Sequence, residues 1–190
     1  FAGHADTSAR RPIVIGYVMD GATLPSIDAR KLDAMHLAFA HVDEAHGIVL
    51  RGDTATAALA GLNALKSENP DLKLLLSIGG WGSGNFSEAA ASDAARATFA
   101  ESAARLVTQH WLDGIDIDWE YPTLPGPGIS HSPADRGNFT RLLQAVRDRL
   151  DALGKADGRH YLLTIAAADG EAARGLDVPR IVPLLDWINL

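Results

Sequence analysis

The stretch LDGIDIDWEYP, residues 112–122, alternates acidic with large apolar side chains. In a β-strand successive side chains point to opposite faces, so Asp116, Asp118 and Glu120 would share one face. Carboxylates crowded on one face of a buried strand repel one another, and an ionised carboxylate buried without a partner is costly. Such a strand persists when protons are shared and at least one pKa is raised. A carboxylic acid that stays protonated near neutral pH serves general acid catalysis, so this stretch indicates an enzyme.

A solvated acidic turn and a metal-binding loop are the alternatives for the same stretch. A solvated turn would not place Ile115, Ile117 and Trp119 between the acids. A calcium loop carries glycine within its acidic run and a liganding glutamate further on, whereas Gly114 precedes this run. Elsewhere, the seven histidines form no ligand set. We therefore expect neither a metal site nor a cofactor.

The composition excludes several other classes of protein. The 190 residues are 47% hydrophobic, which suffices for one sizeable core, and they include no cysteine for disulfides or thiolate metal sites. The formal net charge of -7, without a cluster of Lys and Arg, argues against nucleic acid as a partner. No apolar run approaches the roughly 20 residues that a membrane span requires, so we expect no membrane partner.

Short apolar runs alternate with helical patterns along the chain. The runs predict β-strands at 12–18, 35–42, 72–79, 112–120 and 161–168, and the start of a sixth at 186–190. Apolar residues at helical spacing predict helices at 54–66, at 92–110 with Ser92 as N-cap, and at 132–154 with Ser132 as N-cap and Gly154 at the end. Strands that alternate with helices imply a parallel sheet, here in a single domain.

The candidate functional residues fall where the predicted strands end. In a (β/α)8 barrel the catalytic residues sit at these carboxyl ends. An open doubly wound sheet also uses carboxyl ends, but its first strand usually runs into a glycine-rich phosphate-binding turn. Residues 17–21, Tyr-Val-Met-Asp-Gly, contain no such turn, so the pattern favours the α/β barrel. The residues at predicted strand ends are Tyr17, Ser77, Gly79, Gly80, Asp118 and Glu120.

Two motifs resemble those of glycoside hydrolase family 18, the chitinase family. Residues 113–120 match its Asp-Gly-x-Asp-x-Asp-x-Glu motif, and residues 77–80, Ser-Ile-Gly-Gly, are similar to the Ser-x-Gly-Gly at the end of its third barrel strand. The resemblance extends from Gly16 to Leu190. It implies a (β/α)8 TIM barrel, which takes about 250 residues when complete and is here truncated after about five and a half strands.

The resemblance also implies a domain organisation. Residues 12–190 would form a partial TIM-barrel catalytic domain behind a disordered leader at 1–11, and the parent chain would be longer and monomeric. The family's Met-x-Tyr-Asp element, which grips the substrate's acetamido group, would lie beyond Leu190. The chain starts at Phe1 rather than at methionine, so we expect a trimmed amino terminus. Secretion is implied by the substrate alone, because no hydrophobic signal core is present.

For the reaction, the resemblance implies hydrolysis of β-1,4-linked N-acetylglucosamine polymers, chitin or its oligosaccharides, with retention. The substrate's own N-acetyl oxygen would attack the anomeric carbon, a substrate-assisted exception to the two-carboxylate rule. Glu120 would protonate the leaving oxygen and then activate water, Asp118 would orient the acetamido N–H, and Asp116 would share a proton with Asp118. The alternatives are an endo-β-N-acetylglucosaminidase acting on glycoprotein glycans and a non-catalytic chitin-binding lectin, against which intact Glu120 argues.

Several residues near these acids would play structural roles. Ser77 would satisfy Asp116 in the floor of the barrel. Asp113 has the opposite strand parity and would satisfy backbone donors at the strand entrance. His36 and His41 are five residues apart, which places them on opposite faces of one strand, so we read both as structural imidazoles. Trp111 and Trp187 lie beside helix and strand boundaries and would be packing residues.

The candidate substrate-binding residues lie at or near the strand ends, and four of them are aromatic. The candidates are Tyr17, Phe39, Ser77, Gly79, Gly80, Trp81 and Tyr121. Tyr17 resembles the first-strand tyrosine beneath the central sugar, with ordinary barrel packing as the alternative. Trp81 would stack on a sugar ring, with a hydrophobic lid over a loop as the alternative, and Tyr121 would line the leaving-group subsite. The resemblance further implies a cis peptide between Ala38 and Phe39, which would open the substrate cleft at the end of the second strand.

Overall fold

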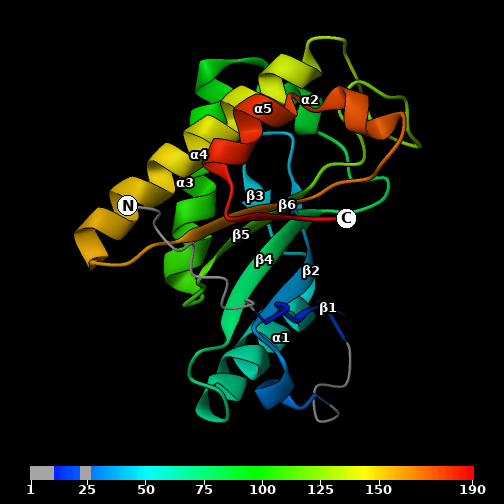
Figure 1. Ribbon diagram of the computed structural model, residues 1–190. Helices are drawn as coiled ribbons and strands as arrows, with labels where there is room; N and C mark the ends of the chain where they lie inside the picture. Colours follow the sequence, from blue (N-terminus) through cyan, green and yellow to red (C-terminus); the bar gives the residue numbers. More distant parts are fainter. Residues whose placement is uncertain (1–10, 22–26) are drawn as a thin grey trace, which may run out of the picture.

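Figure 1 shows the computed structural model, which describes residues 11–21 and 27–190. Six parallel strands form one curved sheet in the order β1-β2-β4-β5-β6-β7, and a short strand, β3, pairs antiparallel with β2. The sheet is a half-barrel with β1 and β7 at its edges, as expected for a truncated (β/α)8 barrel. The strands are β1 (Ile15–Met19), β2 (Ala34–Val42), β3 (Ile48–Val49), β4 (Lys73–Gly79), β5 (Gly114–Asp118), β6 (Leu162–Ala166) and β7 (Trp187–Asn189).

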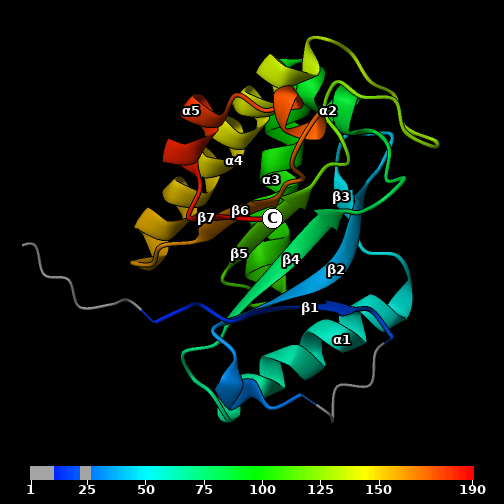
Figure 2. The ribbon, with the colours of Figure 1, turned by 45° about the vertical axis from the view of Figure 1, so that its right-hand side comes forward.

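Helices cover the outer face of this sheet. In Figure 2, α1 runs beside β1 and β2, whereas α3 and α4 lie behind β5 and β6. The α-helices are α1 (Gly52–Ala64), α2 (Phe86–Ala91), α3 (Asp93–Gln109), α4 (Asp135–Asp157) and α5 (Val178–Ile181). Short 3₁₀ helices are η2 (Ala29–Lys31), η3 (Leu65–Ser67), η4 (Ala172–Gly175) and η5 (Val182–Leu184). None of the helices in these described parts of the chain is long and apolar enough to cross a membrane.

Side-chain alternation along the strands divides the sheet into two chemically different faces. Leu74, Leu76 and Ile78 of β4, with Ile115 and Ile117 of β5, belong to the buried cluster that the helices share. The residues between them face the concave side, where the buried polar side chains gather. These polar residues are His36, Ser77, Asp116 and Thr164. The alternation seen in residues 112–120 therefore separates the hydrophobic core from a polar interior.

The helix boundaries agree with the sequence in part. Ser92 caps α3 as expected, accepting a hydrogen bond from the Ala95 amide at 3.2 Å. Ser132, however, is not the N-cap of α4, because that helix begins at Asp135, whose carboxylate accepts from the Ser132 amide at 2.7 Å. Gly154 does not end α4 either: the helix continues to Gly158, which adopts a left-handed φ of 66°. The sequence analysis did not anticipate the short elements α2 and β3.

Gly154 has a packing role inside α4. A Cβ at this position would come within 2.2 Å of the Arg159 carbonyl oxygen. The glycine therefore lets the chain fold back closely onto the helix as it turns toward β6. This close approach explains why a glycine stands in a helix that does not end there.

Asp113 has the structural role that its strand parity predicted. Its carboxylate accepts from the Leu74 amide at 2.9 Å, and it pairs with Lys66 at 2.6 Å and with Arg159 at 2.8 Å. These contacts connect the start of β5 to β4 and to the segments that contain Lys66 and Arg159. The packing prediction for Trp111 is wrong, because its side chain is 76% exposed. Trp111 sits in the left-handed region, with φ at 56°, where the chain leaves α3 and turns away from the core.

Most of the leader predicted at 1–11 lies outside the described residues. Arg11 is described, and its guanidinium forms a bidentate ion pair with Asp33. Asp33 also accepts a hydrogen bond from the Val14 amide at 2.8 Å. Arg11 thus anchors the segment that enters β1.

Candidate active site

Asp116 lies at the centre of the concave face and is completely buried. Its Oδ1 accepts from the Thr164 hydroxyl at 2.6 Å and from the Asn189 amide at 3.3 Å. Its Oδ2 accepts from the Ser77 hydroxyl at 2.7 Å and from the Tyr17 hydroxyl at 2.9 Å. Side chains from four other strands, β1, β4, β6 and β7, therefore converge on this one carboxylate of β5.

The strand register explains part of this convergence. Asp116 is paired with Ser77 on β4 and with Thr164 on β6, so the two hydroxyls flank it directly. The sequence analysis anticipated the contact from Ser77. Tyr17 and Asn189 reach Asp116 from the two edge strands, and the Asn189 amide also donates to the Tyr17 hydroxyl at 2.9 Å. The curvature of the sheet thus brings its opposite edges together over Asp116.

Asp116 and Asp118 differ in their charge state although they are neighbours on one face of β5. Burial alone would raise the pKa of Asp116, but the His36 imidazole and the Thr164 and Ser77 hydroxyls outweigh burial and hold that pKa below its ordinary value. Burial, followed by the nearby charges of Glu120 and Asp116, raises the pKa of Asp118 to about 7. Asp116 is therefore the carboxylate at neutral pH, and Asp118 is the group that can hold a proton.

Glu120 follows the end of β5 and is half-buried. The intervening Trp119 faces the outer core, where it stacks on Phe86 with ring centroids 5.4 Å apart and meets Phe139 edge-on at the same distance. This anchor leaves Glu120 on the same side as Asp118, close enough for its charge to act on Asp118. The peptide between Glu120 and Tyr121 is cis.

Gly79 and Gly80 bring the end of β4 into close contact with its neighbours. A Cβ on Gly79 would lie 2.0 Å from the Asp118 carbonyl oxygen, and Gly79 has a φ of 127°. A Cβ on Gly80 would lie 2.8 Å from the ring of Phe39, and the Gly80 amide donates to the Asp118 carbonyl at 3.0 Å. The two glycines, predicted as substrate-binding residues, thus position Asp118 and Phe39. The Ala38–Phe39 peptide is cis, as expected.

The aromatic candidates lie around this acidic series. Trp81 is 67% exposed, and its ring centroid is 6.3 Å from that of Tyr121, the residue after Glu120. Tyr17 is 43% exposed, but its hydroxyl points inward to Asp116. Burial and the nearby charge of Asp116 raise the pKa of Tyr17, so its hydroxyl remains a neutral donor. Tyr17 therefore both contacts the acidic series and presents a ring surface.

The structure brings three residues to Asp116 that the sequence analysis did not choose as site residues. Thr164 and Asn189 are polar residues near the carboxyl ends of β6 and β7, a position that offered a signal. His36, interpreted as a structural imidazole, has its Nδ1 3.4 Å from Asp116 Oδ2, outside hydrogen-bond geometry. Within residues 11–21 and 27–190, no group of three or more histidine or acidic side chains is placed to hold a metal ion.

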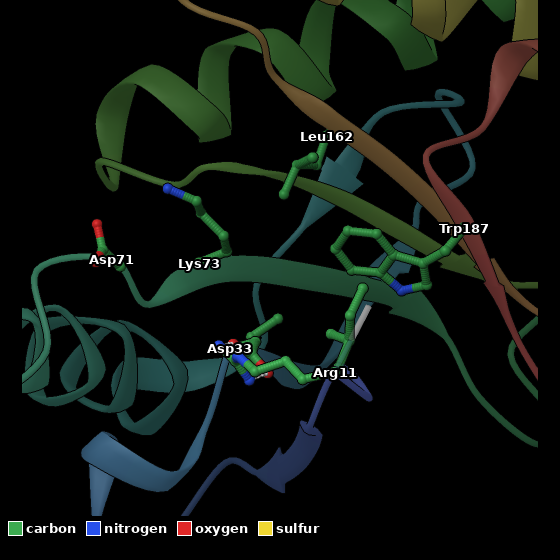
Figure 3. Close-up of a pocket in the computed structure, with 8 residues that line it drawn as sticks. Arg11, Asp33, Asp71, Lys73, Leu162 and Trp187 are labelled. Carbon is green, nitrogen blue, oxygen red and sulfur yellow. Dashed lines mark hydrogen bonds and ion pairs between the residues drawn. The ribbon is translucent and has the colours of Figure 1, made fainter. Parts of the chain in front are cut away.

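A cavity of about 370 Å³ opens at the other end of the strands (Figure 3). Its lining includes Lys73, Leu162 and Trp187, the first residues of β4, β6 and β7. Asp118 ends β5 and Glu120 follows it, so this cavity lies at the opposite rim of the half-barrel from the acids. It is therefore separate from the candidate active site. Trp187, predicted to pack, borders this cavity and is partly exposed.

Comparison with known proteins agrees with this geometry. The family model described as "Glycosyl hydrolases family 18" matches residues 10–190. The chain belongs to glycosyl hydrolase family 18. Among family 18 relatives, Chitinase A1 of Niallia circulans is 44% identical over 151 residues, which make up 76% of this chain and 22% of that protein. Chitinase B of Serratia marcescens is 34% identical over 182 residues, 85% of this chain and 35% of that protein.

Solved structures of similar proteins share the half-barrel. A family 18 N-acetylglucosaminidase from Paenibacillus barengoltzii superposes with a TM-score of 0.84 at 44% identity, covering 93% of this chain and 52% of that one. Chitinase ChiW from Paenibacillus sp. str. FPU-7 superposes with a TM-score of 0.88 at 32% identity, covering 94% of this chain and 24% of that one. The chain thus spans about half or less of the length of each of these four proteins.

Proposed function

We propose that this chain supplies the acid and its supporting carboxylates to a glycosidase that hydrolyses β-1,4-linked N-acetylglucosamine polymers with retention. The observation that carries this proposal is the acidic series itself, in which Asp116 is held ionised while the neighbouring Asp118 has a pKa of about 7 beside Glu120. Carboxyl groups whose environments push their pKa values apart are typical of acid–base sites. Membership of family 18 and the chitinase relatives support the substrate class.

The geometry favours a nucleophile supplied by the substrate. A retaining enzyme with two carboxylates sets them about 5 to 5.5 Å apart on opposite sides of the scissile bond. Asp118 instead ends β5, and Glu120 follows it two residues later on the same side, so neither is placed to attack from the opposite face. The acetamido oxygen of the bound sugar would therefore attack the anomeric carbon.

Each residue of the acidic series then has a role. Glu120 donates its proton to the leaving oxygen as the glycosidic bond breaks, which leaves an oxazolinium ring and a free sugar hydroxyl. Asp118 first passes its own proton toward Glu120. It then accepts a hydrogen bond from the acetamido N–H and stabilises the positive charge of that ring. Glu120 then takes a proton from the water that opens the ring, so that the configuration is retained. Asp116 remains ionised and keeps the exchangeable proton in the Asp118–Glu120 pair.

The test compares substrates that differ at the acetamido group. A chain that contains the complete barrel of this protein should cut a chitin oligosaccharide, but neither its deacetylated form nor a cellulose oligosaccharide. Proton NMR of the first product should show the β-anomer. Efficient cutting of the cellulose oligosaccharide, or release of the α-anomer, would contradict the proposal.

A second candidate differs in the form of the substrate. The similarity to an N-acetylglucosaminidase supports release of single N-acetylglucosamine units in place of internal cutting. An endo-β-N-acetylglucosaminidase would instead cut a high-mannose glycopeptide, and a lectin would bind without cutting. Product lengths from a chitin hexamer, with the glycopeptide tested in parallel, distinguish these functions. Because polymeric chitin lies outside cells, we also propose that the protein acts after secretion.

A further inference from the structure

His36 occupies an unusual place for a structural imidazole. It lies in the middle of β2, is completely buried, and faces the concave side with Asp116. Its ring centroid is 4.6 Å from that of Tyr17 and 6.2 Å from that of Trp187. Among the residues that the structure describes, neither ring nitrogen has a hydrogen-bond partner, whereas buried polar groups are usually satisfied. The Nδ1 atom lies 3.4 Å from Asp116 Oδ2.

The surroundings of Asp116 provide no other positive charge. Its four hydrogen-bond donors, Tyr17, Ser77, Thr164 and Asn189, are all neutral groups. Within the described parts of the chain, no lysine or arginine forms an ion pair with it. A fully buried carboxylate is costly without an opposite charge, even when it is hydrogen-bonded. His36 is placed to supply that charge.

Among the described groups that surround His36, Asp116 is the one that can act as its counter-ion. From β1 comes Tyr17, whose hydroxyl stays neutral, and from β7 come the indole of Trp187 and the amide of Asn189. The residue paired with His36 on β4 is the apolar Leu75, and the next inward residue there is Ser77. Asp116 on β5 is therefore the one ionised group in direct reach of the imidazole among the described residues, with Asp118 one step further along the strand.

We propose that His36 is a positioning residue for the reaction: as an imidazolium beside Asp116, it keeps Asp116 in the carboxylate form and so leaves the exchangeable proton on Asp118, next to Glu120. This inference rests on the proposed function for its catalytic meaning. Without the charge at position 36, Asp116 would take up a proton more readily. Asp116 would then compete with Asp118 for the exchangeable proton, so that less of it would reside on Asp118, next to Glu120.

Two substitutions separate charge from packing and from hydrogen bonding. His36→Leu removes the charge and both nitrogens, whereas His36→Asn keeps a neutral amide donor in the same place. His160→Asn is the matched control, because His160 is 60% exposed and pairs with Asp186 away from the acidic series. If His36→Leu fails to fold, His36→Asn still reports on the charge.

The measurement is carbon-13 NMR of aspartate carboxyl groups in the 190-residue chain, titrated between about pH 2 and pH 9. Asp116→Asn and Asp118→Asn variants assign the two signals. Loss of an opposite charge at this distance should raise the Asp116 midpoint by about 1 to 3 pH units, toward that of Asp118. The His160→Asn chain should titrate like the unmodified one. Unchanged midpoints in a folded His36→Asn chain would overturn the inference.

The readout keeps this inference separate from the proposed function. A complete barrel that cuts no chitin oligosaccharide would contradict the proposed function. The carboxyl titrations would still test the role of His36 independently. In an active barrel, His36→Asn should lower kcat more at neutral pH than at acid pH and leave KM nearly unchanged. A uniform loss of kcat at every pH would indicate a purely structural role for His36.

Discussion

At the scale of single residues, Glu120 is the group on which the proposed chemistry depends most directly. Glu120→Gln keeps the size and hydrogen-bonding shape of the side chain but removes the proton that it transfers. General acid catalysis contributes about 10²- to 10⁴-fold, so kcat on chitin oligosaccharides should fall by at least that factor while binding is retained. Steady-state kinetics and calorimetric binding with the complete barrel measure both effects. Glu68→Gln, at an exposed position, is the control.

Asp118 leads to a prediction about stability and pH. Its pKa in the folded chain is raised from 3.8 to about 7, so between these values the folded state holds a proton that the unfolded chain has lost. The folded state therefore loses stability as the pH rises through this range. Asp118→Asn removes that loss and should raise the free energy of unfolding by about 1 to 2 kcal/mol at pH 8, after allowance for solvent screening at this partly exposed group.

The same substitution should have a much smaller effect on stability near pH 4, where the folded chain keeps the Asp118 proton and the unfolded chain has lost it only in part. Urea unfolding of the unmodified and Asp118→Asn chains at the two pH values measures the difference. Asp71→Asn, at an exposed position on the opposite rim, should change neither value. A larger gain at pH 4 than at pH 8 would mean that Asp118 does not hold the proton.

Single residues also show which features of the site could be predicted from the sequence and which could not. The alternation of Ile115, Asp116 and Ile117 was sufficient to place the acids on one face, because strand geometry is local. The role proposed for His36 was not visible, because it depends on which side chain of β2, two strands away in the sheet, lies close to Asp116. The packing prediction for Trp111 was wrong because its backbone turns into the left-handed region, a conformation that the residue type does not predict.

At the scale of elements, the contact between β4 and β5 depends on Gly79. An alanine there would bring its Cβ 2.0 Å from the Asp118 carbonyl oxygen and would also strain a φ of 127°. We expect Gly79→Ala to lower the free energy of unfolding by about 3 kcal/mol or more, since overpacking and backbone strain add. Urea unfolding measures this loss.

Gly158 is the matched control for that substitution. It too has a positive φ, of 66°, but no atom lies within 4 Å of the position that its Cβ would take. Gly158→Ala should therefore lower the free energy of unfolding only through backbone strain, by about 1 to 2 kcal/mol. Equal losses for the two variants would show that the close approach of β4 to Asp118 contributes nothing.

Elements with strong local signals were predicted well, and those without them were not. The strands and the start of α3 follow from apolar runs and from the Ser92 cap, which act within a few residues. The end of α4 was placed at Gly154, because a glycine late in a helix resembles a C-cap. The structure instead uses Gly154 for a close contact with Arg159, a neighbour that only the folded chain reveals.

At the scale of the whole molecule, the half-barrel has two open edges. Strands β1 and β7 each pair on one side only, and exposed apolar side chains lie along β1, including Met19 at 56% exposure. Open edges of parallel sheets favour pairing with another chain. We therefore expect the 190-residue chain to self-associate, with a sedimentation velocity that rises with concentration.

A charge on the edge should weaken that association. Met19→Lys places a cation on β1 and should shift the sedimentation profile toward monomer. Trp81→Lys, at an equally exposed apolar residue away from the edges, is the control and should leave association unchanged. A monomer at all concentrations, or equal effects from both variants, would contradict a role for the edge.

The bond between Tyr17 and Asn189 joins residues 172 positions apart. Both also contact Asp116, so the full set of partners of this carboxylate is assembled only when the two edge strands of the described sheet, β1 and β7, are in place. During synthesis the acids emerge well before Asn189 does. A nascent chain therefore contains all three acids before the residues that give Asp116 and Asp118 different pKa values are all in place. The capacity for proton transfer is acquired only when β7 docks, even though the acids are translated well before it.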